Sequence, residues 1–133
     1  MALFDFFGKK PATAMNSYEL SCELHPFRLN AHKNDSVELE VYLKNVSVME
    51  QLTSLVIVLP KTLGIDKTGL SQQKEIRIGA MAPGEKRRLL LQIWSTQRTE
   101  AGNYPIKIYA IANYRDYGHV LNEARKVVEL RVV

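Results

Sequence analysis

The amino-acid sequence predicts an all-β fold, a β-sandwich of about seven antiparallel strands in two sheets. Stretches in which apolar and polar residues alternate recur along the chain, and this period of two is typical of strands with one buried face. Gly, Pro and Asn residues typical of turns separate these stretches. No stretch has the 3.6-residue apolar period of an amphipathic helix, so we expect two sheets packed face to face.

Length and composition fit one globular domain. The chain has 133 residues, of which 46% are hydrophobic and 24% are charged, and this balance excludes a wholly disordered or collagen-like protein. A domain of this size buries about two thirds of the surface that its unfolded chain exposes. The net charge of +4 is only mildly basic, so nucleic acid is a disfavoured partner.

Residues 1–16 are predicted to be an N-terminal arm and tether, and residues 17–133 the sandwich. The arm contains Phe4, Phe6 and Phe7, followed by Lys9 and Lys10. We expect the rings either to fold over the chain's own sandwich or to pair with a second copy. The alternative is an anchor for a membrane surface or a protein groove, with the lysines meeting the headgroups. Its contact with a membrane would be weak, because the apolar segment is so short.

The arm also argues for a cytoplasmic protein. Its order, apolar and then basic, is the reverse of a secretory signal, and it is too short to span a bilayer. Cys22 is the single cysteine of the chain and has no partner for an internal disulfide, which favours a reducing compartment.

The first strand is expected at residues 18–24. Pro26 ends it, so the chain should continue in the other sheet or along an edge. The clearest half-buried strand is at residues 37–44, where Val37, Leu39, Val41 and Leu43 face the core. Residues 52–59 are apolar on both sides, so this strand needs cover on both faces.

The middle of the chain is expected to hold two strands joined by a tight turn. Residues 61–73 predict a long loop or a short edge strand, and residues 75–79 a brief strand. Residues 82–85 read Ala-Pro-Gly-Glu and predict a β-turn with Gly84 at its third position, where positive φ is required. A Leu-rich strand follows at residues 86–94.

The central strand is expected at residues 101–114, with Ile106, Ile108 and Ala110 facing the core. Gly102 allows a sharp turn just before Tyr104. This position suits a tyrosine corner, in which the phenol hydrogen-bonds to backbone a few residues upstream. Residues 114–119 then form a hairpin-like connection, and residues 124–133 the last strand.

Three motifs resemble those of a known family. An alternating strand ends in Lys-Asn-Val-Ser at residues 44–47, the Pro-Gly-Glu turn precedes the Leu-rich strand, and Ala-Gly-Asn-Tyr opens the central strand. Across residues 17–133 the chain resembles the immunoglobulin-like modules of the prokaryotic cell-adhesion-related (CARDB) type. The resemblance implies an immunoglobulin-like sandwich that binds or spaces other domains. Such motifs specify a fold far better than a function.

No motif points to catalysis. His25, His32 and His119 lie in separate turn regions without the spacing of a metal site, so we expect surface histidines. Cys22 has no nucleophile signature around it, and its place in the alternation points inward. We therefore expect no enzymatic activity, no cofactor and no bound metal.

An apolar surplus on the outer face of one sheet is the main functional signal. If the strands at residues 52–59, 101–114 and 124–133 lie side by side, their outward apolar residues form a stripe, and an exposed patch of this kind usually marks an interface. The predicted interface residues, those of the arm included, are Phe4, Phe6, Phe7, Val56, Val58, Tyr109, Ile111, Val127 and Val133.

The outer face of the other sheet is expected to be an ordinary solvated face. It carries Glu19, Glu23, Glu38 and Glu40. The candidate anion-binding residues are Lys9, Lys10, Lys86, Arg87 and Arg88. Arg88 is also expected to pair across strands with the glutamates near it.

The favoured hypothesis is a non-enzymatic protein-interaction module. It would form a homodimer or dock on another protein through the apolar sheet face, and symmetric dimers are the commonest oligomers. The alternative is a peripheral membrane or nucleic-acid adaptor that uses the arm and the basic residues.

Overall fold

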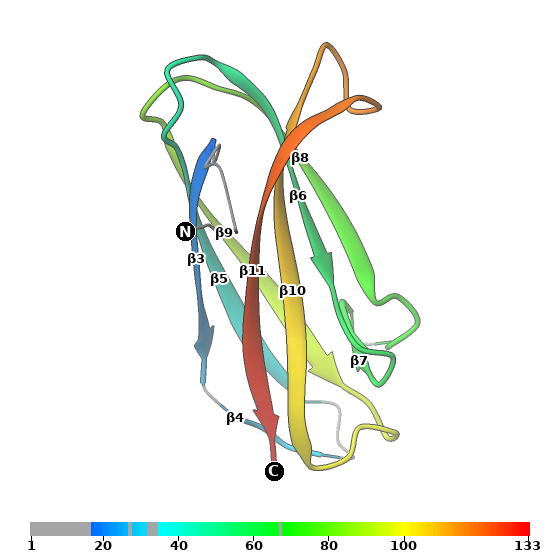
Figure 1. The fold of residues 1–133 in the computed structure, drawn as a ribbon. Helices are drawn as coiled ribbons and strands as arrows, with labels where there is room; N and C mark the ends of the chain where they lie inside the picture. Colours follow the sequence, from blue (N-terminus) through cyan, green and yellow to red (C-terminus); the bar gives the residue numbers. More distant parts are fainter. Residues whose placement is uncertain (1–16, 27, 32–34, 67) are drawn as a thin grey trace, which may run out of the picture.

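The computed structural model is a sandwich of two β-sheets (Figure 1) and describes residues 17–26, 28–31, 35–66 and 68–133. These residues form nine strands and no helix. One sheet has the strand order β4-β11-β10-β6-β8, and the other has the order β3-β5-β9-β7. The strands are β3 (Tyr18–His25), β4 (Arg28–Leu29), β5 (Ser36–Asn45), β6 (Gln51–Val58), β7 (Leu63–Gly64), β8 (Gln73–Met81), β9 (Lys86–Ser95), β10 (Gly102–Asn113) and β11 (Val120–Val132).

The structure confirms the all-β sandwich and adds two short strands to the expected seven. After Pro26 the chain crosses to the other sheet, where β4 pairs in parallel with the end of β11. This confirms the expected change of sheet. β7 pairs with the end of β9, which confirms a short edge strand within residues 61–73. Strands of two residues leave no periodicity in a sequence, and this is why the count was low.

The core lies between the two sheets and follows the predicted alternation. Leu39 and Val41 on β5 and Ile106 and Ile108 on β10 are each 0% exposed. In β6, Leu55 and Ile57 are buried while Val56 and Val58 are half-buried. The strand that is apolar on both sides therefore buries one side fully and the other only in part.

The predicted β-turn at residues 82–85 and the predicted tyrosine corner are both confirmed. Gly84 has a φ of 81°, and the Glu85 N–H donates to the Ala82 carbonyl at 3.0 Å, as a turn with glycine at its third position requires. The Tyr104 hydroxyl donates to the Glu100 carbonyl at 2.7 Å, which is the expected tyrosine corner.

Two strands extend well beyond their predicted bounds, and others differ from theirs by a residue at one or both ends. β8 spans nine residues rather than five, and β11 begins at Val120 rather than at residue 124. In the β10–β11 hairpin the pairing continues past the alternating region, to Asn113 opposite Val120, with a register shift between Ala112 and Asn113. Backbone hydrogen bonds hold a ladder whatever the side chains are, so the hydropathy pattern underestimates its length.

Candidate interaction surface

The predicted apolar residues lie on three neighbouring strands of one sheet. β10 pairs with β6 on one side and with β11 on the other, which confirms the arrangement on which the interface prediction depended. Across the ladder, Tyr109 lies opposite Val56, and Lys107 lies opposite Val58. The outward side chains therefore form rows that run across the sheet.

Exposure shows which of these residues are available at the surface. Val56, Val58, Tyr109 and Ile111 are half-buried, and Val127 is 46% exposed. These five residues are called the apolar face below. Half-exposed side chains on central strands retain apolar surface that a partner can bury.

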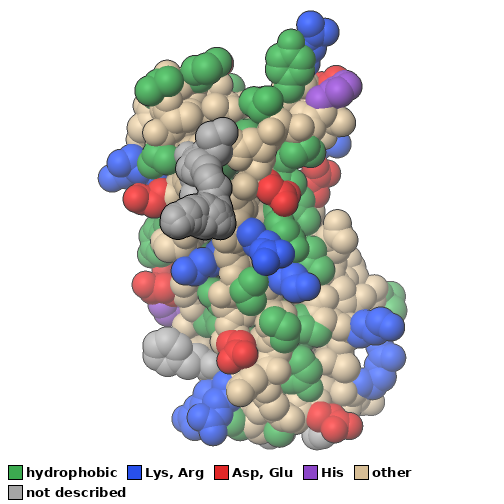
Figure 2. All heavy atoms as spheres, in the orientation of Figure 1, with side chains coloured by type: hydrophobic (Ala, Val, Ile, Leu, Met, Phe, Trp, Pro, Cys, Tyr) green, Lys and Arg blue, Asp and Glu red, His purple; other side chains and the backbone are tan. Residues whose placement is uncertain are grey.

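Two features limit the extent of the predicted stripe. Val133 follows the last residue of β11 and lies eight residues beyond Arg125, the residue opposite Tyr109. At about 3.4 Å per residue this is about 27 Å along the strand direction, so Val133 is not part of the apolar face. Lys107 lies opposite both Val58 and Val127 and places a cation between them. Figure 2 shows hydrophobic side chains interspersed with Lys and Arg side chains on this side of the molecule.

Charged residues flank the apolar face on both sides. On β8, Glu75 lies opposite Val56 and Arg77 lies opposite Ser54. On β11, Arg125 lies opposite Tyr109 and Glu123 lies opposite Ile111. Two registered rows result, each running from β8 to β11. They are Glu75–Val56–Tyr109–Arg125 and Arg77–Ser54–Ile111–Glu123. The four charged residues are called the charged rim.

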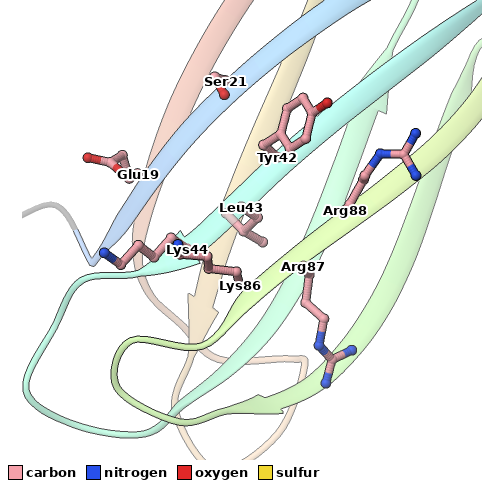
Figure 3. A pocket seen from close by; sticks show the side chains of 8 residues that line it. All are labelled: Glu19, Ser21, Tyr42, Leu43, Lys44, Lys86, Arg87 and Arg88. Atoms are coloured by element: carbon pink, nitrogen blue, oxygen red, sulfur yellow. The ribbon is translucent and has the colours of Figure 1, made fainter.

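The basic run at residues 86–88 does not present three cations together. Arg87 is paired with Glu85 at 2.7 Å between Nε and Oε2, and Arg88 is paired with Glu40. The Arg88–Glu40 pair confirms the expected cross-strand contact. In Figure 3 the two guanidinium groups point away from each other and from the lysines.

A shallow pocket of about 250 Å³ lies beside the basic run on the outer face of the β3–β5–β9–β7 sheet (Figure 3). Lys44 lies opposite Lys86 on β9 and opposite Glu19 on β3. The residues that line the pocket are Glu19, Ser21, Tyr42, Leu43, Lys44, Lys86, Arg87 and Arg88. It is the described cavity nearest to the predicted anion-binding residues of the sandwich.

Glu40 departs from the expected solvated face. Its side chain is only 6% exposed, because neighbouring side chains cover it. Hydrogen bonds from Tyr42, Arg88 and His25 hold the pKa of the Glu40 carboxyl below its usual range. A buried carboxylate with several donors is an ordered polar centre rather than a solvated charge.

Sequence reasoning missed the cluster around Glu40. His25 Nε2 lies 3.1 Å from Glu40 Oε1 and 3.5 Å from Glu23 Oε1. The predicted strand ended at residue 24 and left His25 in a turn, whereas β3 extends to His25, so Glu23 and His25 share one side of the strand. The sequence could not show that Glu40 would lie beside them, because that depends on the register between β3 and β5.

The remaining residues considered in the sequence analysis are Cys22, the other histidines and the residues of the arm. Cys22 is partly buried against the core, and burial raises its thiol pKa to about 11. His119 contacts Asp116 at 2.8 Å in the β10–β11 turn. Phe4, Phe6, Phe7, Lys9 and Lys10 of the arm, and His32, lie outside the described residues.

Comparison with known proteins identifies the fold. No family model matches the chain, and no curated protein matches it. Among solved structures, the CARDB domain of a Pyrococcus furiosus protein, in complex with di-metal ions, is similar with a TM-score of 0.55 and 16% identity over 87% of each chain. The chain shares the immunoglobulin-like β-sandwich fold of this domain.

Other solved structures share this immunoglobulin-like fold. A fragment of α-2-macroglobulin from Escherichia coli, from domain MG7 to the C-terminus, gives a TM-score of 0.62 at 14% identity, with 87% of this chain and 16% of that chain covered. A FixG-related protein from Vibrio parahaemolyticus gives 0.55 at 10% identity, with 88% and 97% covered. Identities this low establish the fold alone.

Membrane insertion through a helix finds no support in the described part of the chain. Among those residues, none forms a helix of the length and apolar character needed to cross a bilayer.

Proposed function

We propose that the protein is a non-enzymatic interaction module that pairs with a second copy of itself through the apolar face. The observation that supports this is the arrangement of that face, in which partly exposed apolar side chains on β6, β10 and β11 lie between charged residues on both sides. An apolar centre with a polar rim is the usual anatomy of a protein interface.

The charge order of the rim favours a second copy over an unrelated partner. In a face-to-face dimer the two-fold axis lies in the plane of the interface. With the axis parallel to the strands, Glu75 would face Arg125 of the second copy, and Arg77 would face Glu123. With the axis across the strands, Glu75 would face Arg77, and Arg125 would face Glu123. Both arrangements bring opposite charges together, and rim charges of this kind set orientation more than affinity.

The first experiment is the mass in solution, measured by light scattering and sedimentation equilibrium over a range of concentrations. The full chain should self-associate, and Ile111→Arg should give a folded monomer because it places a charge within the apolar face, on the middle strand β10. Leu90→Arg is the matched control. Leu90 is an exposed apolar residue on β9 of the opposite sheet, so this variant should self-associate like the unaltered chain.

Charge reversal then identifies the axis. Arg125→Glu should weaken the dimer. If Glu75→Arg restores it in the double variant, the axis runs parallel to the strands; if Glu123→Arg restores it, the axis runs across them. A full chain that stays monomeric at all concentrations, or an Ile111→Arg variant with unchanged mass, would contradict the proposal. A dimer formed only after residues 1–16 are removed would show that the arm covers the face instead.

The adaptor hypothesis is the second candidate, and the observation that favours it is the Lys44–Lys86 pair beside the pocket. Like charges at opposed positions of a ladder repel, and a bound anion would offset that repulsion. Against it, Glu85 and Glu40 neutralise Arg87 and Arg88. Co-sedimentation with anionic vesicles, compared with neutral vesicles at the same salt concentration, separates the two candidates. The adaptor hypothesis expects the protein to sediment with the anionic vesicles, and the dimer proposal expects no binding to either kind of vesicle.

The cytoplasmic location stays part of the proposal. It rests on Cys22 being the only cysteine of the chain, since such a chain gains nothing from an oxidising compartment.

A further inference from the structure

We propose that Glu23, His25 and Glu40 form a binding site for a divalent first-row transition-metal ion. The site lies on the outer face of the sheet opposite the apolar face, and it is independent of the proposed self-association. Each residue offers one ligand atom, and the three atoms lie within 4.8 Å of one another.

The distances between these atoms fit a common coordination shell. His25 Nε2 is 3.1 Å from Glu40 Oε1 and 3.5 Å from Glu23 Oε1. Around a tetrahedral ion with bonds of about 2.0–2.1 Å, neighbouring ligand atoms are about 3.3–3.5 Å apart. The Glu23 and Glu40 oxygens lie within 4.8 Å of each other, and rotation of the exposed Glu23 side chain can bring them to this spacing.

The β-ladder fixes the backbone of all three residues. Glu23 lies directly opposite Glu40 in the antiparallel β3–β5 pair, and His25 lies opposite Glu38. Because residues two apart share a side of a strand, Glu23, His25 and Glu40 project from the same face. Sites built on paired strands hold their ligands more accurately than sites built on loops.

Glu40 is held ready as a ligand by its other contacts. Its Oε2 accepts a hydrogen bond from Arg88 Nε, while its Oε1 faces His25. Tyr42 also hydrogen-bonds to this carboxyl, so the carboxylate is fixed by contacts from two neighbouring side chains besides His25. Hydrogen bonds to the far side of a ligating carboxylate orient it and are typical of metal sites.

The local charge favours a cation. Glu23 lies opposite Glu40 and Glu38 lies opposite His25, and of these three carboxylates Glu40 is the one paired with Arg88. Like charges directly opposite each other destabilise a sheet, as Glu23 and Glu40 do here. A divalent ion bound between them would turn this repulsion into two attractive contacts.

The ligand types indicate the class of metal. Ca²⁺ and Mg²⁺ prefer oxygen ligands only, whereas an imidazole nitrogen suits zinc, copper, iron and nickel. The side chains of His25 and Glu23 are 48% and 62% exposed, so the outer coordination positions are open to water.

The test is a calorimetric titration of the full, tag-free chain with Zn²⁺. A parallel titration with Co²⁺ follows binding by visible absorption. We expect one ion per chain. His25→Ala and Glu23→Gln should each weaken binding at least about tenfold, since loss of an outer-shell partner alone costs about 10- to 100-fold. His119→Ala is the matched control, because His119 also contacts a carboxylate but lies in the β10–β11 turn, and this variant should bind as the unaltered chain does.

His25→Ala, Glu23→Gln and the control His119→Ala all change exposed side chains and leave the core intact. Circular dichroism should therefore show unchanged folding in these three variants. Glu40→Gln is the further variant and should also weaken binding once its folding is verified. Absence of binding below about 1 mM metal, or full affinity in His25→Ala, would overturn the proposal and leave the cluster as a hydrogen-bonded ion pair only.

Discussion

The Tyr104 phenol shows how one side chain fixes the entry to the central strand. Its ring packs against the core, while its hydroxyl donates to the Glu100 carbonyl across the turn that precedes β10. This bond ties the loop to the strand that contacts both β6 and β11.

Tyr104→Phe removes the hydroxyl and keeps the ring. We expect the free energy of unfolding to fall by about 0.5–1.5 kcal/mol, the net value of a typical hydrogen bond. Urea denaturation measures it, with Tyr114→Phe as the control, because Tyr114 lies in an exposed turn and is 53% exposed. Equal midpoints for the two variants would show that the corner adds no stability.

Cys22 provides a pH-dependent prediction. Burial raises its thiol pKa from 9.0 to about 11, so almost all of the group is protonated at pH 8. Because the thiolate is the nucleophile, alkylation by iodoacetamide should be much slower in the folded protein than in urea. The folded-state rate should rise as the pH approaches 11. Mass spectrometry of timed samples measures both rates, and equal rates at pH 8 would contradict the burial argument.

At the scale of the element, β5 is the strand whose sequence and structure agree best. Val37, Leu39, Val41 and Leu43 are at most 2% exposed, and β5 lies between β3 and β9. Local alternation sufficed here because one side of the strand is wholly buried. It did not show that Glu40 on the other side would be buried too.

Leu39→Ala leaves a cavity in the centre of this strand. Deleting a buried leucine side chain costs about 2–5 kcal/mol of unfolding free energy. Leu90→Ala is the control on the adjacent strand. Leu90 is 47% exposed, so its loss should change stability by less than about 0.5 kcal/mol. Chemical denaturation of the two variants side by side checks the difference, and similar losses would mean that Leu39 is not a core residue.

At the scale of the whole molecule, the sandwich is closed by contacts that begin at Ser17. The Ser17 carbonyl accepts the Val46 N–H at 2.9 Å, and its hydroxyl oxygen accepts a hydrogen bond from Asn122 Nδ2 at 3.1 Å. These contacts tie the start of β3 to both sheets. The predicted division between an arm at residues 1–16 and a sandwich at residues 17–133 is testable on this basis.

A chain that starts at Ser17 should fold cooperatively on its own. We expect its unfolding free energy to match that of the full chain within about 0.5 kcal/mol, as for changes outside a packed core. Thermal melting followed by circular dichroism, together with an amide NMR spectrum, measures this. Loss of a cooperative transition would place the first sixteen residues inside the folded unit.

The sequence by itself determined the class of fold, the inward side of most strands and the turn at Gly84. These features depend on periodicity and turn chemistry, which involve residues near one another in the chain. The outward placement of Val56, Val58, Tyr109 and Ile111 followed from the same alternation.

Only the tertiary structure decided which outward residues meet. Strand register set Glu40 beside His25, placed the charged rim around the apolar face, and left Val133 far from it. Register joins residues that are distant in sequence, and a shift of one residue would send every side chain of a strand to the other face. Contacts of this kind are fixed by the packing of two whole sheets, so they leave no local signal in the chain.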